Sequence, residues 1–278
     1  PVAIDSTEDR RKAVADWMTE ESNPYFTRAI VNRVWANFFG VGLVEAVDDL
    51  RITNPASNEK LLNATARFLR EQKYDLKALM RAILQSETYQ RTSEALKENA
   101  TDERYYSRYY PRRLMAEVML DALSQATEVP TKFKGDQERG SQAPIDYPAS
   151  LRALQLPDAY VDSYFLKTFG KPIREKTCEC ERTAEPNVAQ VLHLANGDTM
   201  HQKLTASTGR ITRWIEKKSA PDEIIDEAYL AAFARPPSTG EKQKLLLALN
   251  EAPESDKRAA LEDLLWALLS SKEFLFNH

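Results

Sequence analysis

The chain has 278 residues, of which 42% are hydrophobic and 29% are charged, a composition typical of globular domains. Its net charge of −4 at pH 7 argues against general nucleic-acid binding, because that function usually needs a basic face. No apolar run reaches the roughly 18 residues that a membrane-spanning helix needs, and the presence of only 8 glycines favours helices over many hairpins.

The N-terminal region carries apolar residues at helical spacing, which predicts a first helix from about Thr7 to Glu20. A second helix is predicted to have Asn23 as its N-cap and Pro24 as its first helical residue, since both residue types favour these positions. Gly40 is the expected end of this helix, because glycine accepts the left-handed conformation found at many helix C-termini.

Three more helices are predicted before residue 128. Ser57 or Asn58 is the expected cap of the third, and Asp75 is the expected cap of the fourth. The fifth is predicted to begin at Pro111, with Leu114 among the residues of its apolar face.

The helical spacing returns after residue 185, with Pro221 at one helix start and Ser238 and Glu241 as a capping box at another. About eleven helices are predicted in all, without an internal repeat or a useful strand pattern. The sequence therefore predicts an all-α (mainly α), irregular multi-helix fold. We expect a single domain over residues 1–278, divided into a helical segment (residues 1–127), a long insert (residues 128–184) and a second helical segment (residues 185–278).

The insert lacks a helical pattern except for one predicted turn at residues 162–168, and regular structure is broken at Pro144, Pro148, Pro157 and Pro172. Such long loops inside a domain are uncommon and often functional, so this is the first place to look for a site. Aromatic side chains are expected to anchor it against the helices. These are Tyr160, Tyr164, Phe165 and Phe169.

Polar residues fill the connection at residues 40–58. One interpretation is structural, because Asp and Asn side chains often bond the backbone of their own turn. The functional interpretation is that Asp48, Asp49 and Arg51 line a pocket with Asn32 and Arg33 of the preceding helix. Paired carboxylates can divide acid and base roles when burial separates their pKa values.

Three charged residues, Arg112, Arg113 and Glu117, are expected at the start of the fifth helix. Arg113 and Glu117 lie four residues apart and are predicted to pair on the helix surface. The alternative is a clamp for an anion or a carboxylate, because arginine presents a planar fork of donors.

Both cysteines lie in one C-x-C motif, Cys178 and Cys180, for which three interpretations stay open. They could bind zinc with His193 or His201, although this spacing departs from the common zinc patterns, so no metal is expected. They could form a short, labile disulfide. They could also be inert structural thiols, since the neighbouring glutamates oppose thiolate formation. No C-x-x-C-H motif is present, so no covalent haem is expected on this chain.

Eight motifs occur in a fixed order: NPYFTRAIVNRVW at 23–35, VDDLRITNP at 47–55, YDLK at 74–77, PRRL at 111–114, FLKTFGKP at 165–172, CECER at 178–182, LANG at 194–197 and SKEFLFNH at 271–278. Together they resemble the planctomycete family called domain of unknown function 1553. The resemblance implies a C-terminal domain of an exported protein, with a cytochrome-c-like module often upstream. An extracytoplasmic place and an oxidised Cys178–Cys180 pair follow from that resemblance. The first residue is not Met, so we interpret the chain as a piece of a longer protein.

Two functions remain open from the sequence. The first is a binding or interaction module of an exported, haem-linked multidomain protein, which recognises upstream domains of its parent or a carbohydrate-like ligand. The alternative is a hydrolytic or redox enzyme with its site between the Asp48–Arg51 turn and the 178–182 segment; purely structural packing is a third, minor possibility. The candidate pocket comprises Asn32, Arg33, Asp48, Asp49, Arg51, Asn54, Arg112, Arg113, Glu117, Arg174, Glu181 and Arg182. Haem is expected on an upstream domain, and no cofactor is expected on this piece.

Overall fold

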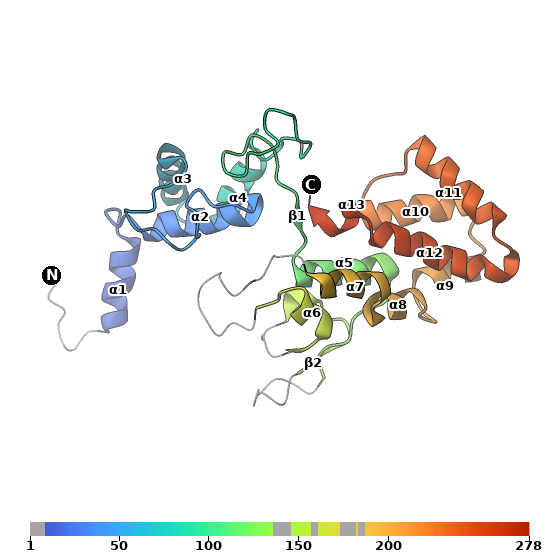
Figure 1. The fold of residues 1–278 in the computed structure, drawn as a ribbon. Helices are drawn as coiled ribbons and strands as arrows, with labels where there is room; N and C mark the ends of the chain where they lie inside the picture. The colour runs from blue at the N-terminus through green and yellow to red at the C-terminus, as the bar shows by residue number, and fades with distance from the viewer. Residues whose placement is uncertain (1–8, 136–145, 157–160, 173–181, 183–186, 278) are drawn as a thin grey trace. The chain divides into compact units, whose positions relative to one another are not determined.

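Figure 1 shows a computed structural model of the chain, which describes residues 9–135, 146–156, 161–172, 182 and 187–277. Helices take up 56% of these residues and strands only 4%. The predicted mainly α fold is therefore confirmed. Each strand in the described ranges has only two residues, which agrees with a sequence that lacks period-2 patterns.

The chain divides into two compact units, one ending at Arg112 and the other running from Arg113 to Asn277. Each unit has its own hydrophobic core, as expected for compact bodies that bury apolar surface independently. That the two units act as a single domain stays a prediction.

Among its described residues, the first unit has four helices: α1 (Arg10–Thr19), α2 (Phe26–Phe39), α3 (Glu59–Glu71) and α4 (Leu76–Leu84). Helix α2 packs against α3, and both contribute to one aromatic and aliphatic core. Trp35 and Phe39, one turn apart on α2, stack with ring centroids 4.3 Å apart. Tyr106, from the loop after α4, packs edge-on against both rings and so joins this loop to the core.

The ends of these helices follow local chemistry, with one correction. Helix α2 begins at Phe26 and not at Pro24. The N-cap residue is Tyr25 and not Asn23 as predicted. The Asn23 side chain still accepts hydrogen bonds from the Tyr25 and Phe26 N–H groups at 2.9 and 3.0 Å, so it holds the turn that leads into the helix. The predicted caps Asn58 and Asp75 are confirmed. Gly40 ends α2 with φ at 80°, as predicted.

The second unit is also mainly helical. Its longer helices are α5 (Ala116–Thr127), α7 (Val188–Asn196), α9 (Arg210–Lys217), α10 (Pro221–Phe233), α11 (Thr239–Glu251) and α12 (Lys257–Leu269). Shorter helices are α6 (Tyr164–Thr168), α8 (Asp198–Leu204) and α13 (Lys272–Leu275), with 3-10 turns η2 (Ala153–Gln155) and η4 (Glu254–Asp256). Pro221 and the Ser238–Glu241 capping box stand where the sequence predicts them.

Helix α5 is a central element of this unit, because it packs against η2, α6, α8, α9 and α10. Its buried face includes Leu120, Leu123 and Ala126, which belong to the larger hydrophobic core. The prediction that Pro111 opens this helix is wrong. Residues Arg112–Arg113 form strand β1, and the helix begins only at Ala116. The chain beyond β1 is fixed to the C-terminal segment by a bond from the Leu114 N–H to the Leu275 carbonyl at 2.9 Å.

The described residues of the insert are ordered by short elements. Strand β2 (Lys134–Gly135) pairs antiparallel with β3 (Val161–Asp162), and α6 confirms the predicted helical turn. Phe165 and Phe169 are buried and stack at 4.3 Å, so they anchor the insert as predicted. Tyr164 is 65% exposed, contrary to the prediction, because it occupies the first position of α6 while its neighbour Phe165 points into the core. Tyr160, the remaining predicted anchor, lies outside the described residues.

Candidate functional site

The connection after α2 is held in place by one buried side chain, Asn32. Its Nδ2 donates to the Val44 and Val47 carbonyls at 3.0 and 2.9 Å, and its Oδ1 accepts from the Val44 N–H at 2.9 Å. Asn32 is fully buried, so these three bonds satisfy a polar group that would otherwise cost folding energy. Gly42 leaves room for this arrangement, since a Cβ there would lie 2.4 Å from the Val44 carbonyl oxygen.

Each of the two aspartates in this connection pairs with an arginine. Arg33 donates through Nε to Asp48 at 2.6 Å. Arg51 binds both carboxylate oxygens of Asp49 at 2.6 Å, and these bonds hold the pKa of the Asp49 carboxyl below its ordinary value. These carboxylates therefore act as partners of arginines that also belong to the predicted pocket.

Asn54 completes the fixation of the connection, because its Nδ2 donates to the Glu45 and Asp49 carbonyls at 2.7 and 3.0 Å. Ser57 donates from its hydroxyl and its backbone N–H to the Leu43 carbonyl. The Tyr106 hydroxyl reaches the same segment and bonds the Gly42 carbonyl at 2.9 Å. The turn is thus rigidly supported from α2 and from the loop after α4.

A cavity of about 350 Å³ lies beside this rigid turn, within the first unit. Arg51 and Asn54, both members of the predicted pocket, line it. Its other lining residues include Tyr25 and Ile52, whose side chains are largely exposed, with Ile52 at 94%. The structure therefore places two residues of the predicted site at an open depression with apolar groups on its rim.

Glu117 and Arg182 form a third ion pair of the predicted site, within the second unit. Arg182 binds both Glu117 oxygens at 2.9 and 3.0 Å, and only 12% of the Glu117 side chain is exposed. Burial raises the pKa of the Glu117 carboxyl, but the bonds from Arg182 outweigh it, and the pKa lies below its ordinary value. The predicted surface pair of Arg113 with Glu117 is wrong, because Arg113 lies in β1 and shares no helix with Glu117.

The neighbouring arginines of β1 bond to backbone carbonyls of their own units. Arg113 donates to the Phe169 carbonyl at 3.2 Å and lies 5.2 Å from that ring's centre, and burial lowers the pKa of its guanidinium. Arg112 donates to the Phe38 carbonyl at 2.8 Å. Both guanidinium groups therefore hold β1 to the backbone at a helix end, which is a structural role.

Four residues of the predicted site, Arg174, Glu181, Cys178 and Cys180, lie outside the described residues. His193, the alternative zinc ligand, is described: its Nε2 lies 3.0 Å from the Thr199 hydroxyl, and its ring packs against Tyr164, Phe165 and Phe169. Within the described ranges, no group of three or more His, Cys, Asp and Glu side chains is placed to hold a metal ion. No helix among those residues is long and apolar enough to cross a membrane.

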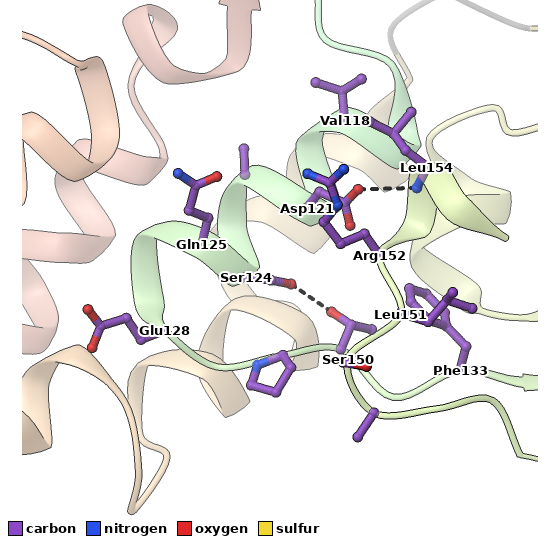
Figure 2. A pocket seen from close by; sticks show the side chains of 14 residues that line it. Val118, Asp121, Ser124, Gln125, Glu128, Phe133, Ser150, Leu151, Arg152 and Leu154 are labelled. Atoms are coloured by element: carbon purple, nitrogen blue, oxygen red, sulfur yellow. Dashed lines mark hydrogen bonds between the residues drawn. The ribbon is translucent and has the colours of Figure 1, made fainter.

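Sequence reasoning missed a second cavity, of about 580 Å³, which lies against α5 in the second unit (Figure 2). It also missed Lys203 of α8, a buried lysine whose Nζ bonds the Ser124 hydroxyl on the wall of that cavity at 3.0 Å. One feature of the sequence could have pointed to Lys203. Lys203 shares the buried face of α8 with Met200 and Leu204, and a lysine on an apolar face calls for a polar partner.

The Ser124 hydroxyl is further surrounded by the Leu120 carbonyl at 2.8 Å and the Thr131 hydroxyl at 3.0 Å. Burial lowers the pKa of the Lys203 ammonium to about 8, and the charge of Asp121 opposes this only partially. A lysine with a lowered pKa beside a serine is a combination that can support proton transfer.

Residues 10–249 match the model of the family PSD1, described as a protein of unknown function (DUF1553). No curated protein matches the chain. No solved structure matches it either. Because the family model covers most of the chain, including the polar turn after α2 and the α5 cavity, this protein belongs to the DUF1553 family.

Proposed function

We propose that this chain is a binding module of an exported, extracytoplasmic multidomain protein, and that it recognises an upstream domain of its own parent. The surface that binds is the depression beside the 40–58 turn in the first unit. Haem, as the resemblance implies, belongs to the upstream region.

The proposal rests on the difference between the charged and the apolar side chains that line the depression. Its charged residues are already paired: Arg51 with Asp49, and Arg28 with Glu59 at 2.9 Å. Beside these paired charges, of which Arg51 is itself exposed, the rim carries the exposed side chains of Ile52 and Tyr25. A rigid surface with paired charges and exposed apolar anchors suits a protein partner, because burial of such anchors supplies most binding energy at interfaces.

A carbohydrate-like ligand fits this surface less well. Sugars need several unpaired donors and acceptors around an aromatic ring, whereas Asn54 directs both bonds of its amide nitrogen to carbonyls within the turn. Among the residues that line the depression, Tyr25 alone offers an exposed ring. The paired state of Asp48 and Asp49 likewise favours binding over acid–base chemistry at this turn.

The test is a titration of this chain with the separately expressed upstream domains of its parent, followed by calorimetry. Ile52→Asp and Tyr25→Ala are expected to weaken the association by about tenfold or more each. Leu96→Asp is the matched control, since Leu96 is also exposed in the first unit but does not line the depression. The proposal would be overturned if the unmodified chain and the three variants bound the upstream domains with equal affinity, or if the chain bound an oligosaccharide panel instead.

A further inference from the structure

The cavity of the second unit has a polar wall and an apolar wall. Asp121, Ser124 and Glu128 succeed one another on a single face of α5 and its C-terminal end and line one side. Phe133 and Leu151 line the other side, as Figure 2 shows. A volume of about 580 Å³ is within the range of small-molecule sites, so a compact substrate can enter with its polar group against α5.

Lys203 approaches Ser124 from outside the cavity lining. It lies on α8, only 7% exposed, and its Nζ donates to the Ser124 hydroxyl at 3.0 Å and to the Val129 carbonyl at 2.7 Å. Among the described residues its ammonium forms no ion pair. Burial of this charge lowers its pKa to about 8, so that a usable share of the amine is neutral at mildly alkaline pH.

The Ser124 hydroxyl therefore lies between the Lys203 amine and the cavity. It donates its proton to the Leu120 carbonyl at 2.8 Å, so the hydroxyl must rotate toward Lys203 before the neutral amine can take that proton. Thr131, which also lines the cavity, places its hydroxyl 3.0 Å from the same oxygen. A nucleophile, a base within hydrogen-bond reach and a nearby hydroxyl donor are the groups that acyl transfer requires.

We propose that Ser124 and Lys203 form a nucleophile and base pair that hydrolyses small carboxylic esters with an apolar acyl group in the α5 cavity. The activity is independent of the binding proposed for the first unit. The acyl group of the substrate would lie against Phe133 and Leu151, and its carbonyl against Ser124.

The reaction proceeds in two balanced steps. Neutral Lys203 takes the proton of Ser124 while Oγ forms a bond to the carbonyl carbon; the carbon–alkoxy bond then breaks, and the alkoxide leaves with that proton as an alcohol. Water next attacks the acyl-serine, gives a proton to Lys203, and releases the carboxylic acid as the proton returns to Oγ. The Thr131 hydroxyl lies on the cavity wall 3.0 Å from Ser124 Oγ, and in the proposed reaction it would donate to the negative oxygen of each tetrahedral intermediate.

The decisive experiment is covalent labelling of the full chain by a fluorophosphonate. Such a probe forms an Oγ–P bond to an activated serine and releases fluoride. We expect one adduct, which peptide mass spectrometry places on Ser124, and a faster reaction at pH 9 than at pH 7. Ser124→Ala should abolish it. Ser207→Ala, at an exposed serine of the second unit that does not line the cavity, should leave it unchanged.

Lys203→Arg separates catalysis from packing. Arginine keeps a cation that can bond Ser124 and Val129, but it cannot act as a base near neutral pH. Fluorophosphonate labelling and hydrolysis of p-nitrophenyl butyrate are expected to fall by about 100-fold in this variant. Its circular dichroism spectrum is expected to match that of the unmodified chain. Undiminished labelling in a folded Lys203→Arg variant would refute the proposal. If that variant does not fold, labelling of the unmodified chain is the test. Absence of an adduct on Ser124 in the folded, unmodified chain between pH 7 and 9 would then refute the proposal.

Discussion

Asn32 holds Val44 through both ends of its amide, because Nδ2 donates to the Val44 carbonyl at 3.0 Å while Oδ1 accepts the Val44 N–H at 2.9 Å. Two residues twelve positions apart are thereby joined as if they were neighbours in a sheet. This joint fixes the turn that carries Asp48, Asp49 and Arg51, and thus the shape of the depression beside it.

Asn32→Asp is expected to destabilise the first unit by about 3 kcal/mol, since it removes the donor and buries a charge against two carbonyls. Chemical unfolding followed by circular dichroism measures the loss. Asn37→Ala is the control, because Asn37 is exposed and donates only to the Arg33 carbonyl one turn earlier. Equal stability of the two variants would contradict the role given to Asn32.

The pair of Glu117 and Arg182 predicts a dependence of stability on acid. The folded pKa of Glu117 lies below its unfolded value, so its contribution is present above an unfolded pKa of about 4.5 and is lost as pH falls through the folded pKa. Arg182→Gln is expected to remove about 2 kcal/mol at pH 7 and to raise the pKa of Glu117. The unfolding free energies of the two proteins should converge as pH falls below about 4.5 and through the folded pKa of Glu117. A gap that stays constant from pH 7 down through that range would exclude the pair as its cause.

Lys203 predicts that stability also rises with pH in the alkaline range. Its pKa falls from 10.5 in the unfolded chain to about 8 in the fold, so the unfolded chain binds more protons between these values and stability rises with pH there. Relative to Lys203→Met, the unfolding free energy should increase by up to about 3 kcal/mol from pH 8 to 10.5. The measurement is the difference between the two unfolding curves at each pH, in which other titrating groups cancel. Curves that stay parallel would show that Lys203 is not perturbed.

Gly209 is required by the backbone before α9. Its φ is 117°, and a Cβ there would lie 2.8 Å from the Thr127 carbonyl oxygen and 2.7 Å from Val129. Gly209→Ala is expected to destabilise the second unit by about 2 kcal/mol or more. Gly240→Ala is the matched control, since nothing lies within 4 Å of its added Cβ on α11, and alanine there should stabilise by about 0.5–1 kcal/mol. Thermal unfolding of both variants gives the comparison, and a shift of the same sign in both would contradict this reasoning.

The sequence alone determined the helical class and many helix ends. Asn58, Asp75 and Ser238 were predictable as caps because each bonds a backbone N–H two or three residues away, inside the window that a pattern covers. Where a local sequence pattern predicted the wrong element, contacts with residues far away in the sequence determined the structure instead. Pro111 precedes a strand and not a helix, because Leu114 bonds Leu275 from the far end of the chain.

The tertiary structure decided which of the polar residues meet. Glu117 pairs with Arg182, 65 positions away, and not with Arg113 four positions before it. Lys203 reaches Ser124 across 79 positions, and no spacing in the sequence links them. Helix caps depend on bonds between residues that are close in sequence. The pairs of Glu117 and Ser124 with distant residues form only when α5 packs against the elements around it. Burial in that core makes a polar partner necessary, and the packing brings one within hydrogen-bond distance.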